Sequence, residues 1–256
     1  GAAGSRVVVE ECLQGKEVSV FAFTDGENMS PLIAVCDYKR LLDGDRGPNT
    51  GGMGSYTPPP FWTAELSKKI QQDVVYPTIK AMAEEGTPYK GVLYVGLMLT
   101  DDGFKVLEFN CRLGDPETQV IIPSMKSDLL EVMLATINGG ISATSVDWGD
   151  QSSTGVVMAA RGYPGDYRRG LEIEGLDDLD EDIQVFHSGT GRPQKESSRI
   201  VTTGGRVLTV VSSRPTLEEA RTHVYENIGR VSFQGCHYRK DIGLIAGQIS
   251  TDRRAG

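Results

Sequence analysis

Three residues combine types and spacing that point to chemistry: Glu108, Asn110 and Arg112, at alternate positions of the sequence LEFNCRLGDPETQ. In a β-strand, alternate side chains point to the same face, so the three would lie together. Carboxylate and carboxamide oxygens are ligands of hard cations such as Mg2+. With a guanidinium beside them, they indicate phosphate or acyl-phosphate chemistry. An ion pair between Glu108 and Arg112 at the end of a strand is the structural alternative.

Two strand-like runs position these residues. Residues 91–100 (GVLYVGLMLT) are almost wholly apolar, which is typical of a strand buried on both faces. Residues 101–103 (DDG) are a turn signal, and the alternating run from 104 to 110 follows them, so the pattern predicts a hairpin. Strict alternation in the second strand would put Phe104 and Val106 on the same face as the two oxygen ligands.

A second candidate is the segment 37–60 (DYKRLLDGDRGPNTGGMGSYTPPP), which has no helix or strand pattern and is predicted to be a long loop. Glycines at 51, 52 and 54 would let backbone N–H groups approach an anion closely. Lys39, Arg40 and Arg46 add local positive charge. The pattern favours a binding loop over an ordinary surface loop.

The remainder of the first half is predicted to be scaffold. Residues 7–9 (VVV) indicate a buried strand, and residues 17–24 and 32–36 an antiparallel pair. An apolar stripe predicts a long helix from Thr63 to Gly86 that Pro77 kinks, and a second helix covers 129–137 behind the capping residues Asp128 and Glu131.

Residues 138–153 are rich in Gly, Ser and Asp and mark a boundary. Beyond it, the pattern predicts strands at 155–160 and 183–186, a hairpin of 200–202 with 206–211, and a helix capped by Thr216 and Glu219. The predicted division is a first domain over 1–145, a small α+β domain over 153–246 and a flexible tail over 247–256.

Composition narrows the function classes. The chain has 256 residues and a net charge of −9, which argues against non-specific binding to nucleic acid or to an anionic membrane. No apolar run approaches the roughly 20 residues of a spanning helix. Four scattered cysteines and three distant histidines predict neither a zinc site nor disulfides, and they favour a cytoplasmic protein (Cys12, Cys36, Cys111 and Cys236).

Several segments, in order from about Val7 to Gly243, closely resemble the glycinamide ribonucleotide synthetase (phosphoribosylamine–glycine ligase) family of ATP-grasp enzymes. They are VVVEECLQGKEVS, DYKRLLDGDRGPNTGGMGSY, GVLYVGLMLT, LEFNCRLGDPETQ, RGYPGDY and VFHSGT. The long loop and the EFNCRLGDPETQ run are specific to this family, whereas the E-x-N-x-R core is shared with other ATP-grasp ligases. The implied fold is α+β: the antiparallel sheet and helices of a large ATP-grasp lobe, then a small C-terminal α+β domain.

The resemblance implies an ATP-dependent ligase of purine biosynthesis that joins glycine to 5-phosphoribosylamine through glycyl phosphate, with Mg2+ or Mn2+. Glu108 and Asn110 would hold the metal, and Arg112 would act on the acyl centre. Nucleotide contacts would come from Glu10 and Glu11 beside the adenine and from Glu17 at the ribose hydroxyls. Contacts to the amino substrates would come from residues of the long loop and one beyond it (Asp37, Lys39, Arg40, Gly51, Gly52, Gly54 and Asp115).

One departure from the family pattern matters. The family begins with an α/β domain and a small lobe whose lysines and glycine-containing loop clamp the nucleotide, and this chain opens just before the hinge. The resemblance therefore implies a fragment that is inactive alone and whose partner is the N-terminal part of the same enzyme. Another ATP-grasp carboxylate–amine ligase or carboxylase, or a catalytically silent binding module of the same fold, remain alternatives.

Overall fold

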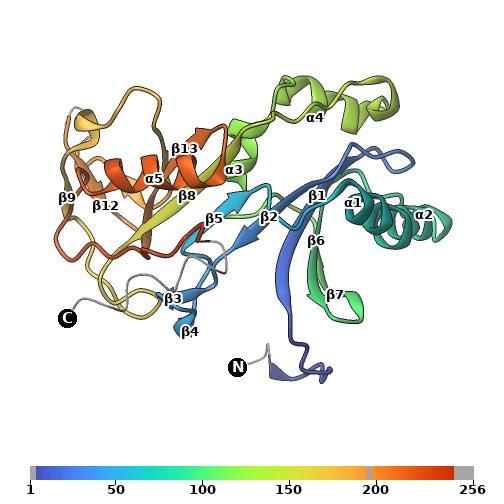
Figure 1. Cartoon of the computed structure of the whole chain (residues 1–256), viewed down its shortest axis with the longest axis horizontal. Coiled ribbons are helices and arrows are strands. Elements are labelled where there is room, and N and C mark those ends of the chain that lie inside the picture. Colours follow the sequence, from blue (N-terminus) through green and yellow to red (C-terminus); the bar gives the residue numbers. More distant parts are fainter. Residues whose placement is uncertain (1–3, 195–197, 245–256) are drawn as a thin grey trace.

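The computed structural model describes residues 4–194 and 198–244, and its main feature is one eight-stranded sheet (Figure 1). All neighbouring strands pair antiparallel, in the order β10-β13-β8-β5-β2-β1-β6-β7. These strands are β1 (Lys16–Thr24), β2 (Ile33–Asp37), β5 (Gly54–Thr57), β6 (Gly91–Thr100), β7 (Gly103–Asn110), β8 (Ser152–Ala159), β10 (Gln184–His187) and β13 (Arg206–Arg214). The smaller sheets are β3 (Arg40–Leu42) with β4 (Arg46–Asn49), and β11 (Thr190–Gly191), β12 (Ile200–Thr202) and β9 (Glu172–Ile173).

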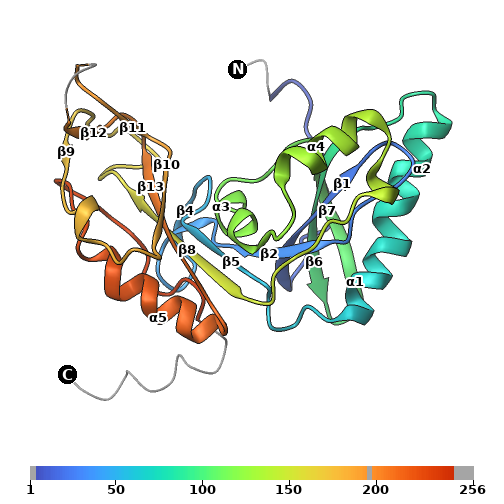
Figure 2. The ribbon, with the colours of Figure 1, turned by 90° about the horizontal axis from the view of Figure 1, so that it is seen from above.

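Helices cover both faces of the sheet. On one face, α1 (Ala64–Ile70) and α2 (Tyr76–Glu84) pack on β1 and β6 through a core that includes Val20 and Ile79. On the other face lie α3 (Thr118–Ile121) and α4 (Leu129–Asn138), as Figure 2 shows. The helix α5 (Leu217–Ile228) packs on β8 and β13. Short helical turns are Ile122–Ser124, Ile141–Ala143 and Leu176–Asp178.

Local sequence signals account for most of these boundaries. The Thr63 side chain accepts a hydrogen bond from the Leu66 N–H at the start of α1, and Thr216 and Glu219 form the predicted capping box of α5. Between α1 and α2, Gln71–Val75 forms a π-helical segment just before Pro77. Pro77 lacks an N–H, so a wide turn at this point is the expected irregularity.

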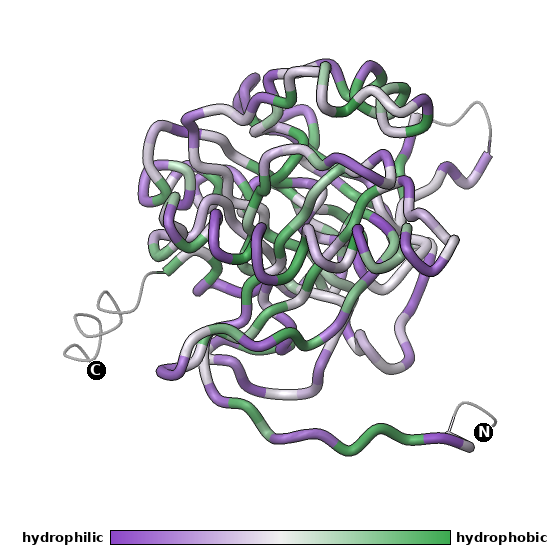
Figure 3. Tube along the Cα trace, turned by 90° about the vertical axis from the view of Figure 1, so that its right-hand side faces the viewer, coloured by the Kyte–Doolittle hydropathy of each residue, from purple (hydrophilic) through white to green (hydrophobic). Residues whose placement is uncertain are grey.

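Two predictions for the first half are wrong. Residues 7–9 are exposed and pair with none of the described strands, and Figure 3 shows this segment extending away from the sheet. A run of valines forms a buried strand only where a neighbouring strand accepts its hydrogen bonds. The segment 37–60 is also not one long loop, because β3 and β4 form a hairpin and β5 lies inside the main sheet between β2 and β8.

The predicted hairpin of residues 200–211 is wrong as well. Both halves are strands, but β12 pairs with β11 and β9, whereas β13 pairs with β10 and β8. The intervening residue Gly204 packs closely against the backbone at Gly189, because a Cβ on Gly189 would lie 2.6 Å from the Gly204 Cα. Sequence alone does not distinguish such a close approach from a tight turn.

The main sheet is continuous across the predicted domain boundary, because β8 pairs with β5 from the first half and β13 from the second. The division at 145–153 therefore stays a prediction. The predicted tail, and residues 245 and 246 of the predicted second domain, lie outside the described residues. No helix of the described part of the chain is long and apolar enough to cross a membrane.

Candidate active site

A β-bulge decides where the predicted metal ligands point. In the β6–β7 pair, Gly96 lies opposite Glu108 while the next residue, Leu97, lies opposite Val106, so Leu107 is the extra residue of the bulge. Val106 therefore shares the face of Leu97, on the side of α1 and α2, and Glu108 points to the opposite face. The prediction that Phe104 and Val106 share a face with the oxygen ligands is wrong for this reason.

Beyond the bulge, Glu108 and Asn110 lie side by side on one face, as the spacing predicts. The Asn110 Nδ2 donates to the Glu108 Oε1 at 3.0 Å. One carboxylate and one carboxamide on an exposed edge strand form an oxygen donor set that fits Mg2+ or Mn2+, which keeps water or phosphate oxygens as its other ligands. Within residues 4–194 and 198–244, no cluster of three or more His, Cys, Asp or Glu offers a fuller metal cage.

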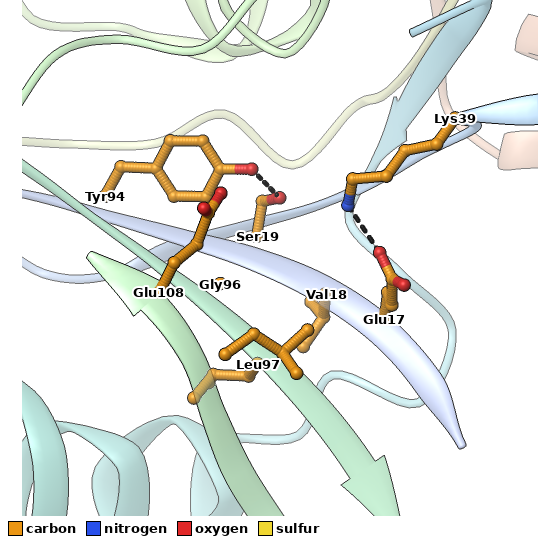
Figure 4. Close-up of a pocket in the computed structure, with 9 residues that line it drawn as sticks. Glu17, Val18, Ser19, Lys39, Tyr94, Gly96, Leu97 and Glu108 are labelled. Atoms are coloured by element: carbon orange, nitrogen blue, oxygen red, sulfur yellow. Dashed lines mark hydrogen bonds and ion pairs between the residues drawn. The ribbon is translucent and has the colours of Figure 1, made fainter. Parts of the chain in front are cut away.

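A cavity of about 230 Å3 is lined in part by Glu108 (Figure 4). Its walls come from β1, β6, β7 and the residue Lys39 just beyond β2. The lining contains both polar and apolar residues: Glu17, Val18, Ser19, Lys39, Tyr94, Gly96, Leu97, Leu107 and Glu108.

Lys39 supplies the positive charge of the cavity. Its ammonium forms an ion pair with the carboxylate of Glu17, which Figure 4 shows, and lies 3.5 Å from the Oδ1 of Asp37. Burial alone would lower the pKa of Lys39, but the two carboxylates outweigh it and raise that pKa. Burial, followed by the repulsion of Glu17, raises the pKa of the Asp37 carboxyl against the opposing effect of Lys39. Lys39 is therefore held as a cation.

A buried hydrogen-bonded network behind the cavity was not predicted from the sequence. The Tyr94 hydroxyl donates to the Glu117 Oε1 at 2.9 Å, and it lies 2.7 Å from the Ser19 Oγ. Glu117 is only 3% exposed. The one sequence signal for it was an acidic residue three positions before the apolar run 120–122, which is too common a pattern to single it out.

Arg112 lies close to this network. Its guanidinium stands 6.0 Å from the centre of the Tyr94 ring, and its Nη1 donates to the carbonyl oxygen of Leu113 at 3.1 Å. An arginine over the face of a tyrosine gains a modest attraction and keeps its remaining N–H groups available. The structure thus brings Lys39 and Glu108 to one cavity, with Asn110 beside Glu108 and Arg112 near the ring of Tyr94, which also lines it.

The glycine loop (residues 51–54) does not line this cavity and lies against the second half of the chain. The guanidinium of Arg206 donates to the carbonyl oxygen of Gly51 at 2.6 Å and binds Asp115 through both its backbone oxygen and its carboxylate. The N–H of Gly51 donates to the Tyr163 hydroxyl, and that of Gly52 to Thr50 Oγ1. Because these N–H groups already have acceptors, Gly51 and Gly52 do not offer free N–H groups to an anion in this conformation.

The remaining predicted residues occupy separate places. Asp115 lines a second cavity of about 420 Å3, between the segment Gly114–Gln119 and residues 186–188. Gly54 starts β5 where a Cβ would lie 2.7 Å from the Gly155 carbonyl oxygen. Arg40 is exposed and donates to the Gly47 carbonyl. Glu10 and Glu11 are exposed in the extended segment before β1 and do not line the first cavity.

Comparison with known families matches both halves of the chain. Residues 1–118 match the family described as "Phosphoribosylglycinamide synthetase, ATP-grasp (A) domain", and residues 153–245 match "Phosphoribosylglycinamide synthetase, C domain". Biotin carboxylase domains resemble the chain in fold alone. One example is the domain of Hydrogenobacter thermophilus 2-oxoglutarate carboxylase, which was solved with MgADP and bicarbonate. Its TM-score is 0.58 at 15% identity, and the match covers 87% of this chain and 47% of that one.

Several relatives are much more similar. The phosphoribosylamine–glycine ligase of Halalkalibacterium halodurans is 47% identical over 96% of this chain and 56% of its own length. The human trifunctional purine biosynthetic protein adenosine-3 is 47% identical over 96% of this chain and 24% of its own. The crystal structure of the Thermotoga maritima phosphoribosylamine–glycine ligase has a TM-score of 0.79 and 39% identity, over 91% of this chain and 56% of that one.

The chain thus spans about half the length of the single-function relatives that it matches. The α+β ATP-grasp fold that the sequence predicts is confirmed by these neighbours. The level of identity over nearly the whole chain, and the two matches in their expected order, support one assignment. The chain belongs to the phosphoribosylglycinamide synthetase family of ATP-grasp ligases.

Proposed function

We propose that this chain forms the metal and acyl-transfer half of an ATP-dependent ligase that joins glycine to 5-phosphoribosylamine in purine biosynthesis. The observation that carries the proposal is the hydrogen-bonded Glu108–Asn110 pair beside a cavity that also holds Lys39 and lies near Arg112. Relatives with this activity in their names, at 46–47% identity over most of the chain, support it. ATP, glycine and the amine are the proposed substrates, with Mg2+ or Mn2+ as the metal.

The first step joins two anions, glycine's carboxylate and the γ-phosphate of ATP. When bound, the metal supplies charge neutralisation and a template for the phosphate oxygens. Glu108 and Asn110 would hold it through side-chain oxygens. Lys39, held as a cation by its carboxylate neighbours, would screen the approaching anion once a substrate carboxylate or phosphate competes with Glu17 for it.

The second step forms the amide. Arg112 would orient the acyl group and stabilise the oxyanion that develops at its carbon as the amine attacks. One such donor contributes about 3 to 4 kcal/mol to the transition state in comparable enzymes. The guanidinium of Arg112 lies 6.0 Å from the centre of the ring of Tyr94, which lines the cavity, and this proximity supports the proposed role.

The adenine and ribose contacts of Glu10, Glu11 and Glu17, and the substrate contacts of Asp37, Arg40, Asp115 and the glycines, stay predictions. Glu17 has the clearest support because it lines the cavity. A different ATP-grasp ligase or carboxylase would share the metal pair, and a silent binding module would share only the fold.

One experiment separates these possibilities. ADP release by the full-length enzyme that contains this chain should require ATP, a divalent metal, glycine and freshly prepared phosphoribosylamine together. Release with another amine or with bicarbonate, and none with phosphoribosylamine, would favour a different ligase or a carboxylase. Nucleotide binding without any turnover would favour a silent module.

A further inference from the structure

Glu117 is a buried carboxylate that the mechanism above does not use. It lies in the segment Gly114–Gln119, and its side chain accepts a hydrogen bond from Tyr94, which lines the first cavity. Its Oε1 accepts from Tyr94 at 2.9 Å and from Ser19 at 3.5 Å. Ser19 and Tyr94 both line the cavity and lie 2.7 Å apart (Figure 4). A continuous chain of hydrogen bonds therefore runs from the cavity wall to a carboxylate that solvent does not reach.

An ordinary structural role does not explain this carboxylate well. A buried carboxylate is costly unless it is paired with a cation, yet in the described part of the chain no Lys, Arg or His nitrogen lies within ion-pair distance of Glu117. Burial, followed by the charge of Asp37, raises its pKa against the opposing effects of its own backbone N–H, the Tyr94 hydrogen bond and the more distant charge of Lys39. The Tyr94 hydroxyl as donor, in place of a cation, leaves Glu117 able to take up a proton.

The other acidic groups around the cavity are committed to different contacts. Glu17 is paired with Lys39, and Asp37 lies within 3.5 Å of the same ammonium. Glu108 accepts from Asn110 and faces the metal position. A carboxylate held by a neighbouring cation is a weak proton acceptor, since the cation stabilises its ionised form. Glu117 is the acidic group of this set that is linked to the cavity through hydroxyls alone.

We propose that Glu117 is the final acceptor of a proton relay, through the hydroxyls of Ser19 and Tyr94, that removes the proton lost by the amine during amide formation. This inference rests on the proposed ligase function. Arg112, which we assign to the acyl centre, stands over the ring of Tyr94, so the reacting carbon would lie near the entrance of the relay.

Amide formation makes one bond at the acyl carbon and breaks another. The nitrogen lone pair of the amine forms the C–N bond to the acyl carbon, and the C–O bond to phosphate breaks, with its electron pair leaving on the phosphate. The nitrogen then carries a positive charge and two protons; one of these passes to the Ser19 Oγ, the Ser19 proton passes to the Tyr94 Oη, and the Tyr94 proton passes to Glu117, which leaves a neutral amide N–H. Release of product and phosphate returns that proton to solvent by the same route.

The test separates the two chemical steps in the full-length enzyme. Glycine-dependent positional isotope exchange in 18O-labelled ATP, measured without amine, reports formation of the acyl phosphate, and product formation reports both steps. Glu117→Gln keeps the shape but cannot accept a proton. It should reduce amide formation by about 100-fold or more, the usual range for general base catalysis, while isotope exchange stays within about threefold. In the unaltered enzyme the rate of amide formation should fall at low pH as Glu117 becomes protonated, and Glu117→Gln should not show this fall.

A second variant keeps the test valid if Glu117→Gln folds poorly. Tyr94→Phe leaves the carboxylate in place but interrupts the relay, and it should show the same selective loss. Tyr225→Phe is a matched control, because its buried hydroxyl bonds to the Arg239 carbonyl and the Ile242 N–H, remote from the cavity. Hydroxylamine is a more reactive nucleophile that needs less help from a base. When it replaces the amine and hydroxamate formation is measured, the rates of both relay variants should lie closer to that of the unaltered enzyme.

The inference fails if Glu117→Gln lowers isotope exchange and amide formation by the same factor, or if it leaves both unchanged. It also fails if hydroxylamine shows the same deficit as phosphoribosylamine. Failure of the proposed function itself would be seen separately, because the unaltered enzyme would then show no glycine-dependent isotope exchange.

Discussion

Gly52 lies against Pro116: a Cβ built on Gly52 would lie 2.3 Å from the Pro116 Cδ, and the φ of Gly52 is +111°. The glycine loop therefore packs directly on the segment that carries Asp115 and Glu117 on its two sides. Together with the hydrogen bonds of Arg206 to Gly51 and Asp115, this contact holds the loop against the segment that lines the second cavity.

The contact predicts that Gly52→Ala destabilises the protein. Both the left-handed backbone and the collision with Pro116 act against a β-carbon, so we expect a loss of about 2 kcal/mol or more in the free energy of unfolding. Gly86→Ala is the control, since its φ is +77° and a Cβ there would meet nothing within 4 Å. Thermal unfolding of both variants would contradict this account if they lose equal stability.

Arg112→Lys tests the assignment of the acyl centre. Lysine keeps the charge but cannot make the paired, planar contacts of a guanidinium. We expect turnover of the full-length enzyme to fall by about 100-fold while the affinity for ATP changes by less than about threefold. Arg169→Lys, at another arginine over a tyrosine ring, should leave turnover unchanged. Loss of ATP affinity with full turnover at saturation would assign Arg112 to the nucleotide instead.

The raised pKa of Glu117 predicts a pH-dependent stability. Below the ordinary glutamate pKa of 4.5 both the folded and the unfolded state bind the proton. As the pH rises from there through the raised folded-state pKa, the unfolded state loses its proton first, so this group makes the folded state progressively less stable. Glu117→Gln removes the effect. Its Tm relative to the unaltered protein should therefore increase as the pH rises above about 4.5. A constant difference would show that the carboxyl is not shifted.

Much of the scaffold follows from local sequence signals. The alternation in β1, the turn at residues 101–103 and the capping residues Asp128 and Thr216 all act within a few positions of the chain, and each lies where the pattern predicts it. The shared face of Glu108 and Asn110 is of the same kind, because it depends only on the period of a strand.

Features that depend on contacts between distant segments could not be predicted. The bulge at Leu107 arises from pairing with β6 and reverses the faces of the residues before it. The burial of Glu117 depends on Ser19 and Tyr94 from two other strands. The exposure of residues 7–9 reflects the lack of a pairing strand among those described, which their valine-rich composition does not reveal.

The assignment of Glu108 and Asn110 as metal ligands is the central claim, and the metal dependence of turnover tests it most directly. Glu108→Ala in the full-length enzyme removes the carboxylate of the pair, whereas Glu84→Ala removes one that only faces Lys80 on α2. ADP release in the presence of all substrates, measured over a Mg2+ titration, should fall by about 100-fold or more in Glu108→Ala and require more metal for half-saturation. The Glu84 control should match the unaltered enzyme. Near-normal turnover of Glu108→Ala with an unchanged Mg2+ dependence would contradict the account.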